Sequence, residues 1–364
     1  MMNCTSSNVT KVLSFYTNDT IHSSAFSELV DKSIRITDVS KAIVIISVCN
    51  FLIKIPCLAV FVNIIRFQSF TMIHTHLLLL TVIEIINQFS TAVYVGFQIE
   101  IYQNTLIEMV SLLNVVIFQI SFRVFLGLSF GFYIVRTWWI TIISLIRTHT
   151  IVSQQNLTRS SPRFCFEIYL FLFISIASLV FSFSLAKDNK CDYCFSEIEQ
   201  KYLISCLFQT ENENKLRKIT STLLILIFNS CFPICIITIC SVVDFYHIIE
   251  NTIRPLIRFK KPLILLLILT TCYLVLELPL FAVHIYHEVM GLALSNSDIP
   301  QNVQSNDREI ELKLEHLKIN LLITVGECLS HINSFLNIFI YFFMDPIFYK
   351  TLRSMLSYST RQHI

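Results

Sequence analysis

The sequence predicts an all-α membrane protein, a seven-transmembrane helix bundle with a short amphipathic eighth helix. Of its 364 residues, 54% are hydrophobic and only 14% are charged, whereas soluble domains carry about 25% charged residues. The chain also holds seven apolar segments, each long enough for a helix to cross the bilayer. So few ionised groups cannot coat a soluble globule, which excludes a soluble enzyme.

The predicted spans are the apolar stretches 42–65, 76–97, 112–146, 164–186, 219–243, 262–286 and 317–344. The third is long for one crossing and contains Arg123, so an eight-span alternative stays open. Residues 1–41 lack the order of a cleavable signal peptide, a basic region followed by an apolar one. Residues 345–364 predict the amphipathic helix and a short cytoplasmic tail, because Pro346 suits a first helical turn and basic and apolar residues follow it.

Charge and sequons predict that the amino end is extracellular. In this orientation the cytoplasmic segments hold eleven basic residues against four acidic ones, and the outer segments hold 13 basic against 18 acidic. Sequons at Asn3, Asn8 and Asn18 would then face the secretory lumen as glycosylation sites. We therefore predict a multi-pass plasma-membrane glycoprotein. A net charge of +2 without a long basic run makes nucleic acid an unsuitable partner.

Most of the twelve cysteines fall in or beside predicted helices and are expected to be reduced packing residues. The second outer loop contains Cys191, Cys194 and Cys206, and we expect a disulfide between two of them. The spacing of Cys191 and Cys194 is also that of a metal-ligand pair, but no second pair follows. We therefore predict no metal and no cofactor.

Charged side chains inside predicted spans are candidate functional residues, because each needs a partner or a water-filled cavity. We predict that Arg136 pairs with Glu277, which stands two residues before Pro279, where the sixth span should bend. A static bridge that only fixes the packing is the alternative. Lys54 with Glu84 or Glu327 forms a second possible pair.

The seventh span repeats a hydrogen-bonding side chain every four residues, at Asn333, Asn337 and Tyr341, which indicates one face turned toward protein. Residues at the outer ends of the sixth and seventh spans are candidates to line a ligand pocket. The acidic excess outside favours a basic ligand, such as a peptide containing arginine. The candidate ligand-binding residues are His284, Tyr286, His287, Glu327 and His331.

The stretch from Asn333 to Arg353 resembles the seventh and eighth helices of rhodopsin-like receptors. Asn337 and Tyr341 match the first and last residues of that family's Asn-Pro-x-x-Tyr motif, whose proline is lost here. Arg147, in Leu145-Ile146-Arg147-Thr148, is similar to the family's switch arginine, without the acid that usually precedes it.

Further fragments resemble one subgroup, the nematode Srw-class serpentine chemoreceptors, which are related to neuropeptide receptors. They are Arg136-Thr137-Trp138-Trp139, Glu277-Leu278-Pro279 and Phe342-Phe343-Met344, and the resemblance covers about residues 42–356. It implies a receptor that binds an extracellular neuropeptide or chemosensory cue and activates a heterotrimeric G protein. The resemblance gives the switch role to Arg147, Asn337, Tyr341 and Pro279.

Departures from this family change some expectations. The family's sodium-site acid on the second helix would fall near Ile86 or Asn87, and neither residue is acidic. Arg136 is therefore expected to supply a fixed positive charge where the sodium ion would lie. Phe122 and Arg123 occupy the region of the usual third-helix cysteine. Because Arg147 lacks the acid of its own motif, the resemblance implies a weak resting lock and appreciable basal signalling.

Two other classes of protein share some of these features. A secondary transporter also buries charged pairs, but the chain shows no internal repeat and contains only 5 Gly. An intramembrane metalloenzyme could use His74 with His76, or His284 with His287, but the predicted topology places these two pairs on opposite sides of the membrane. We therefore predict that the protein is not an enzyme, and that ligand-evoked G-protein activation distinguishes it from a transporter.

Overall fold

The computed structural model describes residues 23–67, 72–103, 107–109, 111–153, 163–188, 192–196, 201–205, 231–253, 261–296 and 305–362. These residues form eight helices and three short strands. The prediction of a helical membrane protein is confirmed. The helices are α2 (Ser23–Phe67), α3 (Met72–Gln103), α4 (Leu112–Ser153), α5 (Arg163–Asp188), α7 (Phe232–Ile253), α8 (Lys261–Asn296), α9 (Ser305–Met344) and α10 (Pro346–Gln362).

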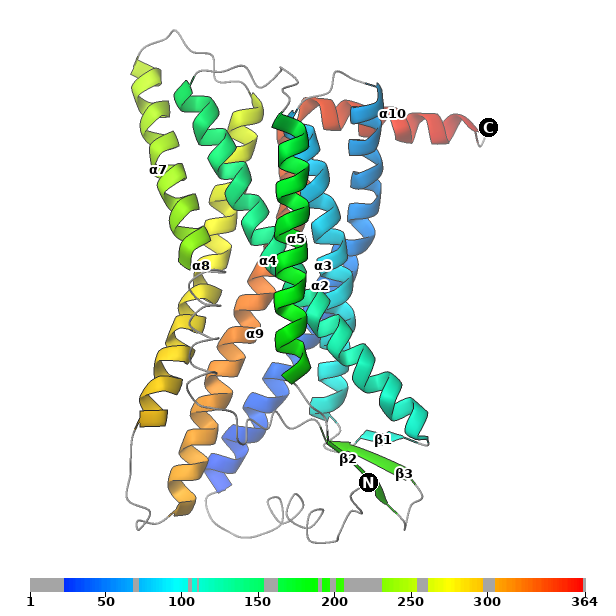
Figure 1. The fold of residues 1–364 in the computed structure, drawn as a ribbon, viewed down its shortest axis with the longest axis vertical. Coiled ribbons are helices and arrows are strands. Elements are labelled where there is room, and N and C mark those ends of the chain that lie inside the picture. Colours follow the sequence, from blue (N-terminus) through cyan, green and yellow to red (C-terminus); the bar gives the residue numbers. More distant parts are fainter. Residues whose placement is uncertain are drawn as a thin grey trace.

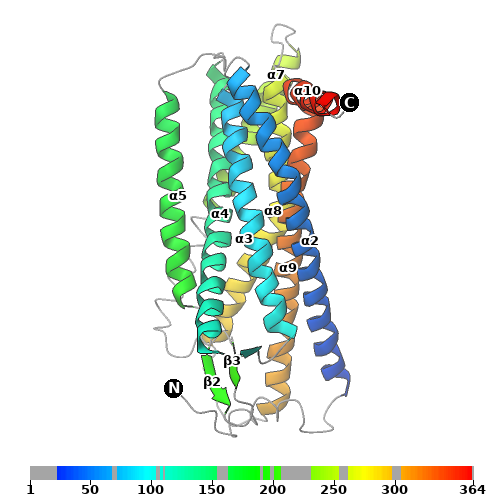
Figure 2. The ribbon, with the colours of Figure 1, turned by 90° about the vertical axis from the view of Figure 1, so that its right-hand side faces the viewer.

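Most of the helices run lengthwise in one elongated bundle, and α10 lies across one end of it (Figure 1). Helix α2 contacts both α3 and α9, while α4 packs against α3, α5, α7 and α8. Figure 2 shows α5 on the outer side of α4. Helix α4 is therefore the central element, and its side chains can reach most of the other helices.

Five of the described helices are long and apolar enough to cross a membrane. Helices α5 and α7 carry shorter apolar stretches, Tyr169–Ser184 and Phe232–His247. Helix α4 continues past Arg123 without a break, so the eight-span alternative, which needs two helices there, is not supported. The first half of the predicted span 219–243 lies outside the described residues. The apolar stretches of these five helices, which we call the transmembrane stretches, are Ile34–Arg66, Ile73–Ile99, Leu113–Val152, Ile264–Val283 and Lys318–Met344.

A small antiparallel sheet at the end opposite α10 was not predicted (Figure 1). Its strands are β1 (Ile107–Met109), β2 (Asp192–Ser196) and β3 (Lys201–Ser205), in the order β1-β3-β2. Ile107 is paired with Ile204, and Asp192 with Ser205. Strands of three to five residues are too short for a clear alternation of polar and apolar positions, which is why the sequence did not reveal them.

The bundle has large apolar side chains outside and charged ones inside. Phe173 and Phe343 are 70% and 74% exposed, whereas Lys54, Glu84 and Arg136 are buried. A surface of this kind is stable in contact with lipid and unfavourable in contact with water. This arrangement supports a multi-pass protein of the bilayer.

Asp345 anchors α10 to the bundle. Its Oδ1 accepts hydrogen bonds from the backbone N–H groups of Ile347 (2.9 Å) and Phe348 (3.2 Å), and thus caps the helix that Pro346 begins. Its Oδ2 lies 3.1 Å from Nε2 of His74 on α3. One carboxylate therefore fixes both the start and the direction of α10.

Candidate functional site

Glu84 on α3 is the centre of a buried polar network. Its Oε2 binds the ammonium of Lys54 on α2. Its Oε1 accepts hydrogen bonds from Ser334 Oγ (3.0 Å) and Asn337 Nδ2 (2.8 Å) on α9. Nε of Arg136 lies 3.5 Å from the same oxygen. Side chains from four helices therefore meet at one carboxylate.

Glu277 on α8 is the second acid of this network. Nη1 of Arg136 lies 3.1 Å from Glu277 Oε1 and donates to Ser330 Oγ at 3.0 Å. The Ser330 hydroxyl in turn donates to Glu277 Oε1 at 2.6 Å, and the Tyr133 hydroxyl donates to Oε2 at 3.2 Å. The guanidinium carbon of Arg136 also lies 5.5 Å from the centre of the Tyr273 ring. Arg136 therefore bridges both acids.

We call the seven residues that join α2, α3, α4, α8 and α9 in this way the core network. Their two bases and two acids balance, so the network is neutral as a whole. The structure brings together Arg136 with Glu277 and Lys54 with Glu84, and it does not form the alternative pairing of Lys54 with Glu327. The core network consists of Lys54, Glu84, Arg136, Glu277, Ser330, Ser334 and Asn337.

Glu84 stands two and three residues before Ile86 and Asn87, and its carboxylate faces Asn337 on α9. A shift of this size turns a helical side chain to a different face. Asn333 is buried as expected, yet its amide makes no hydrogen bond to the described residues, whereas the next residue, Ser334, binds Glu84.

Arg147 forms a second buried site near the carboxyl end of α4. Its Nε binds the carboxylate of Asp244 on α7, and neither side chain is exposed. Its Nη1 donates to the Leu266 carbonyl at 3.1 Å and to the Thr270 hydroxyl, both on α8. Its Nη2 donates to Ser144 at 3.2 Å. We call Arg147, Asp244 and Thr270 the inner lock.

The inner lock overturns the reasoning that Arg147 has no acidic partner. The motif around Arg147 does lack an acid, but α7 supplies one. Asp244 stands near the end of an apolar segment, so it was assigned to the cytoplasmic charges and not to the interior of the bundle. The ring of Tyr341 packs edge-on against Phe61 at 5.4 Å and lies 6.1 Å from the ring of Phe348.

Pro279 lies inside α8, directly before a close contact with α9. A Cβ on Gly326 would lie 2.9 Å from the Cα of Leu280, so only glycine allows this approach. Pro279 is two residues beyond Glu277, which belongs to the core network. The proline therefore stands where α8 is held by both α4 and α9.

Among the candidate ligand residues, the structure describes the side chains of His331, Glu327 and Tyr286. His331 is buried, with Nδ1 2.9 Å from Gln88 Oε1. Glu327, one turn farther out on α9, is half-buried, and Tyr286 on α8 is exposed. Other predicted positions lie outside the described residues. For three of them only the side chain is not described: His284, His287 and Cys194. The remaining ones are the sequon residues Asn3, Asn8 and Asn18 and the cysteines Cys191 and Cys206.

No group of three metal-ligating side chains occurs among the described residues. His74 binds Asp345, while the backbone carbonyl of His76 accepts a hydrogen bond from Trp139 Nε1 at 3.1 Å. The two histidines thus make separate structural contacts.

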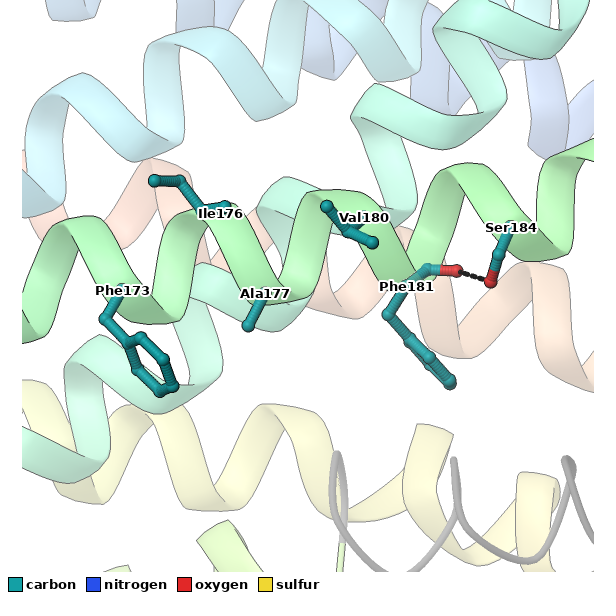
Figure 3. Close-up of a pocket in the computed structure, with 6 residues that line it drawn as sticks. All are labelled: Phe173, Ile176, Ala177, Val180, Phe181 and Ser184. Atoms are coloured by element: carbon teal, nitrogen blue, oxygen red, sulfur yellow. Dashed lines mark hydrogen bonds between the residues drawn. The ribbon is translucent and has the colours of Figure 1, made fainter.

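A shallow groove of about 490 Å³ runs along the outer face of α5 (Figure 3). Within it, the Ser184 hydroxyl donates to the Phe181 carbonyl at 2.6 Å. None of its lining residues belongs to the core network or the inner lock. They are Phe173, Ile176, Ala177, Val180, Phe181 and Ser184.

A scan of the chain against protein-family models and a comparison with curated proteins found no match.

Proposed function

We propose that this chain is a seven-transmembrane receptor of the plasma membrane, with its amino end outside, that passes ligand binding to a heterotrimeric G protein. The proposal keeps the resemblance to Srw-class chemoreceptors and neuropeptide receptors as its starting point. The inner lock is the observation that carries it. An arginine at the inner end of the central helix, closed off by α7 and α8, is a resting switch that movement of these helices would open.

Helix α8 touches α4 at both buried sites. Glu277 binds Arg136, and Thr270 binds Arg147. Thr270 and Glu277 are seven residues apart, about two helical turns, so both face α4. A tilt of α8 about Pro279 therefore changes the core network and the inner lock together. This shared element is the physical link between an outer signal and an inner response.

The core network also explains how such a movement can be reversible. Arg136 contacts two acids, and Ser330 bridges Arg136 and Glu277. If α8 moves, Arg136 keeps Glu84 as a partner, so its guanidinium is not left without a counter-charge in a low-dielectric interior. The transporter alternative gains no support from the core network, because each acid is already held by a base.

Asp244→Asn tests the proposal. The amide keeps the size of the side chain and removes the charge that holds Arg147. At equal surface expression, we expect ligand-independent G-protein dissociation to rise several-fold in a resonance-energy-transfer assay across the Gα classes, and Arg147→Ala in the same chain to abolish the increase. Asp38→Asn, at an exposed acid of α2, is the matched control.

Wild-type basal activity should be low, because the inner lock is complete. Unchanged basal activity of Asp244→Asn with every Gα class would contradict the proposal. Concentrative uptake of a labelled solute by the wild type, without G-protein activation, would favour the transporter instead.

A further inference from the structure

Glu327 is half-buried. Among the acids of the transmembrane stretches whose side chains the structure describes, it is the one that no base neutralises. It forms no ion pair or hydrogen bond with any described residue, although it lies well inside the stretch Lys318–Met344. The other acids in these regions are held by bases. Glu84 binds Lys54, Glu277 binds Arg136, Asp244 binds Arg147, and Asp345 binds His74.

Glu327 stands on the inward face of α9. It precedes Ser330 by three residues and His331 by four, and side chains at this spacing share one helix face. Ser330 and His331 point into the bundle, because they bind Glu277 and Gln88. Glu327 is therefore directed into the same interior, one turn closer to the outer end.

Access decreases along this face from the outside inward. Ser330 and His331 are 4% and 7% exposed, whereas Glu327 is only half-buried. Glu327 follows Lys318, at the outer end of the span, by nine residues, or about 14 Å of helix. A group entering from outside would thus reach Glu327 before it reached the core network.

We infer that Glu327 binds a cationic group of the extracellular ligand, a guanidinium or an ammonium. This inference rests on the proposed receptor function and names the chemistry of its ligand. A carboxylate without a counter-charge at this depth is costly, and a ligand cation provides both the charge and the hydrogen bonds that it lacks. The acidic excess of the outer segments attracts the same class of ligand.

The position of Glu327 also connects a bound cation to the switch. Its neighbour Gly326 touches the backbone of Leu280, the residue after Pro279. One turn inward, Ser330 binds both Arg136 and Glu277. A cation at Glu327 therefore acts on α9 where this helix meets both the turn of α8 beside Pro279 and the core network.

The test uses Nα-acetyl-L-arginine amide as the probe, with Nα-acetyl-L-citrulline amide as its neutral isostere and tyramine as an ammonium probe. Full-length receptor in lipid nanodiscs is titrated with each compound, and binding is followed by the rise in Tm. We expect both cations, and not the citrulline compound, to raise the Tm of the wild type. A lower apparent Kd for the arginine compound than for tyramine indicates a peptide arginine as the source, and the reverse order indicates a small amine.

The variants separate charge from shape. Glu327→Gln should weaken binding of the cations at least about tenfold, because a charge-assisted hydrogen bond is lost. Glu327→Asp keeps the charge and should restore most of the affinity, and Asp38→Asn should bind like the wild type. Equal binding by Glu327→Gln and the wild type would overturn the inference, as would a wild type that neither cation stabilises at millimolar concentration. The Asp244→Asn assay needs no ligand, so it distinguishes this failure from a failure of the proposed receptor function.

Discussion

Asp244 on α7 holds Nε of Arg147 on α4, and both side chains are completely buried. The same guanidinium reaches α8 through Thr270 and the Leu266 carbonyl. An arginine whose donors are distributed over two neighbouring helices keeps those helices together at their inner ends. Any opening of this region must replace these contacts by others, for example with a partner protein.

The two halves of the inner lock should differ in their contribution to stability. Asp244→Asn leaves a buried guanidinium without its anion, which costs about 3–5 kcal/mol. Thr270→Val keeps the shape and removes one hydrogen bond to a charged group, which costs about 1.5–3 kcal/mol. We expect the Tm of the purified protein to fall in both variants, and farther in Asp244→Asn. A larger fall in Thr270→Val would show that α8, and not α7, is the main partner of Arg147.

The pair of Lys54 and Glu84 should show strong coupling in a double-mutant cycle. Glu84→Gln leaves Lys54 buried without its acid and should destabilise the protein by about 3–5 kcal/mol. Adding Lys54→Met removes the stranded charge, so the double variant should be more stable than Glu84→Gln alone. Thermal unfolding of the wild type, the two single variants and the double variant in one detergent provides the comparison. Additive losses would mean that the two side chains act independently.

The neutrality of the core network predicts that sodium has no effect on the protein. The Tm and the basal activity should be equal in NaCl and in choline chloride at the same ionic strength, because both acids already bind bases. Arg136→Ser leaves one negative charge in excess, beside the hydroxyls of Ser330 and Ser334. This variant should gain a sodium-dependent rise in Tm. If sodium raised the Tm of the wild type and of Arg136→Ser equally, the pairing of both acids with bases would be contradicted.

Gly326 and Gly96 offer a matched comparison of a crowded and an open glycine. A Cβ at Gly326 meets the Leu280 backbone at 2.9 Å, whereas a Cβ at Gly96 meets nothing within 4 Å. Gly326→Ala should therefore cost about 1–3 kcal/mol and alter signalling, since it separates α8 from α9 beside Pro279. Gly96→Ala should be neutral or stabilise by up to about 1 kcal/mol. Equal Tm values for the two variants would contradict the close approach.

The register of β2 and β3 predicts which cysteines of the second outer loop are bridged. Asp192 is paired with Ser205, and Cys194 with Leu203. Cys191 and Cys206, which lie outside the described residues, precede and follow the first pair in the sequence. Residues that are directly opposed in an antiparallel pair lie near the separation that a disulfide spans. Non-reduced peptide mapping should find Cys191 linked to Cys206, and a bridge involving Cys194 would contradict this register.

The sequence predicted the features that depend on local composition. Hydropathy located the helices, and the cost of a charge in lipid indicated that Arg136 and Glu277 face protein. Pro346 marked the first residue of α10. For Lys54 the sequence left two possible acids, and only the structure chose Glu84.

Contacts that depend on tertiary packing could not be predicted. Asp244 and Arg147 are 97 residues apart, and His74 and Asp345 are 271 apart, with no spacing rule that relates them. Helix ends also differed from expectation: α2 begins at Ser23 and α9 at Ser305, before the apolar stretches where hydropathy placed them. Polar helical turns outside the bilayer carry no hydropathy signal, so their lengths follow from packing.

The core network sets an order for assembly in the bilayer. Lys54 and Glu84 lie on consecutive helices, so α2 and α3 can enter the membrane as a hairpin whose charges already cancel. Arg136 then adds a positive charge, and Glu277, which balances it, is synthesised 141 residues later. A nascent chain that stops before α8 therefore carries an excess cation in lipid, and quality control should recognise it until the last helices arrive.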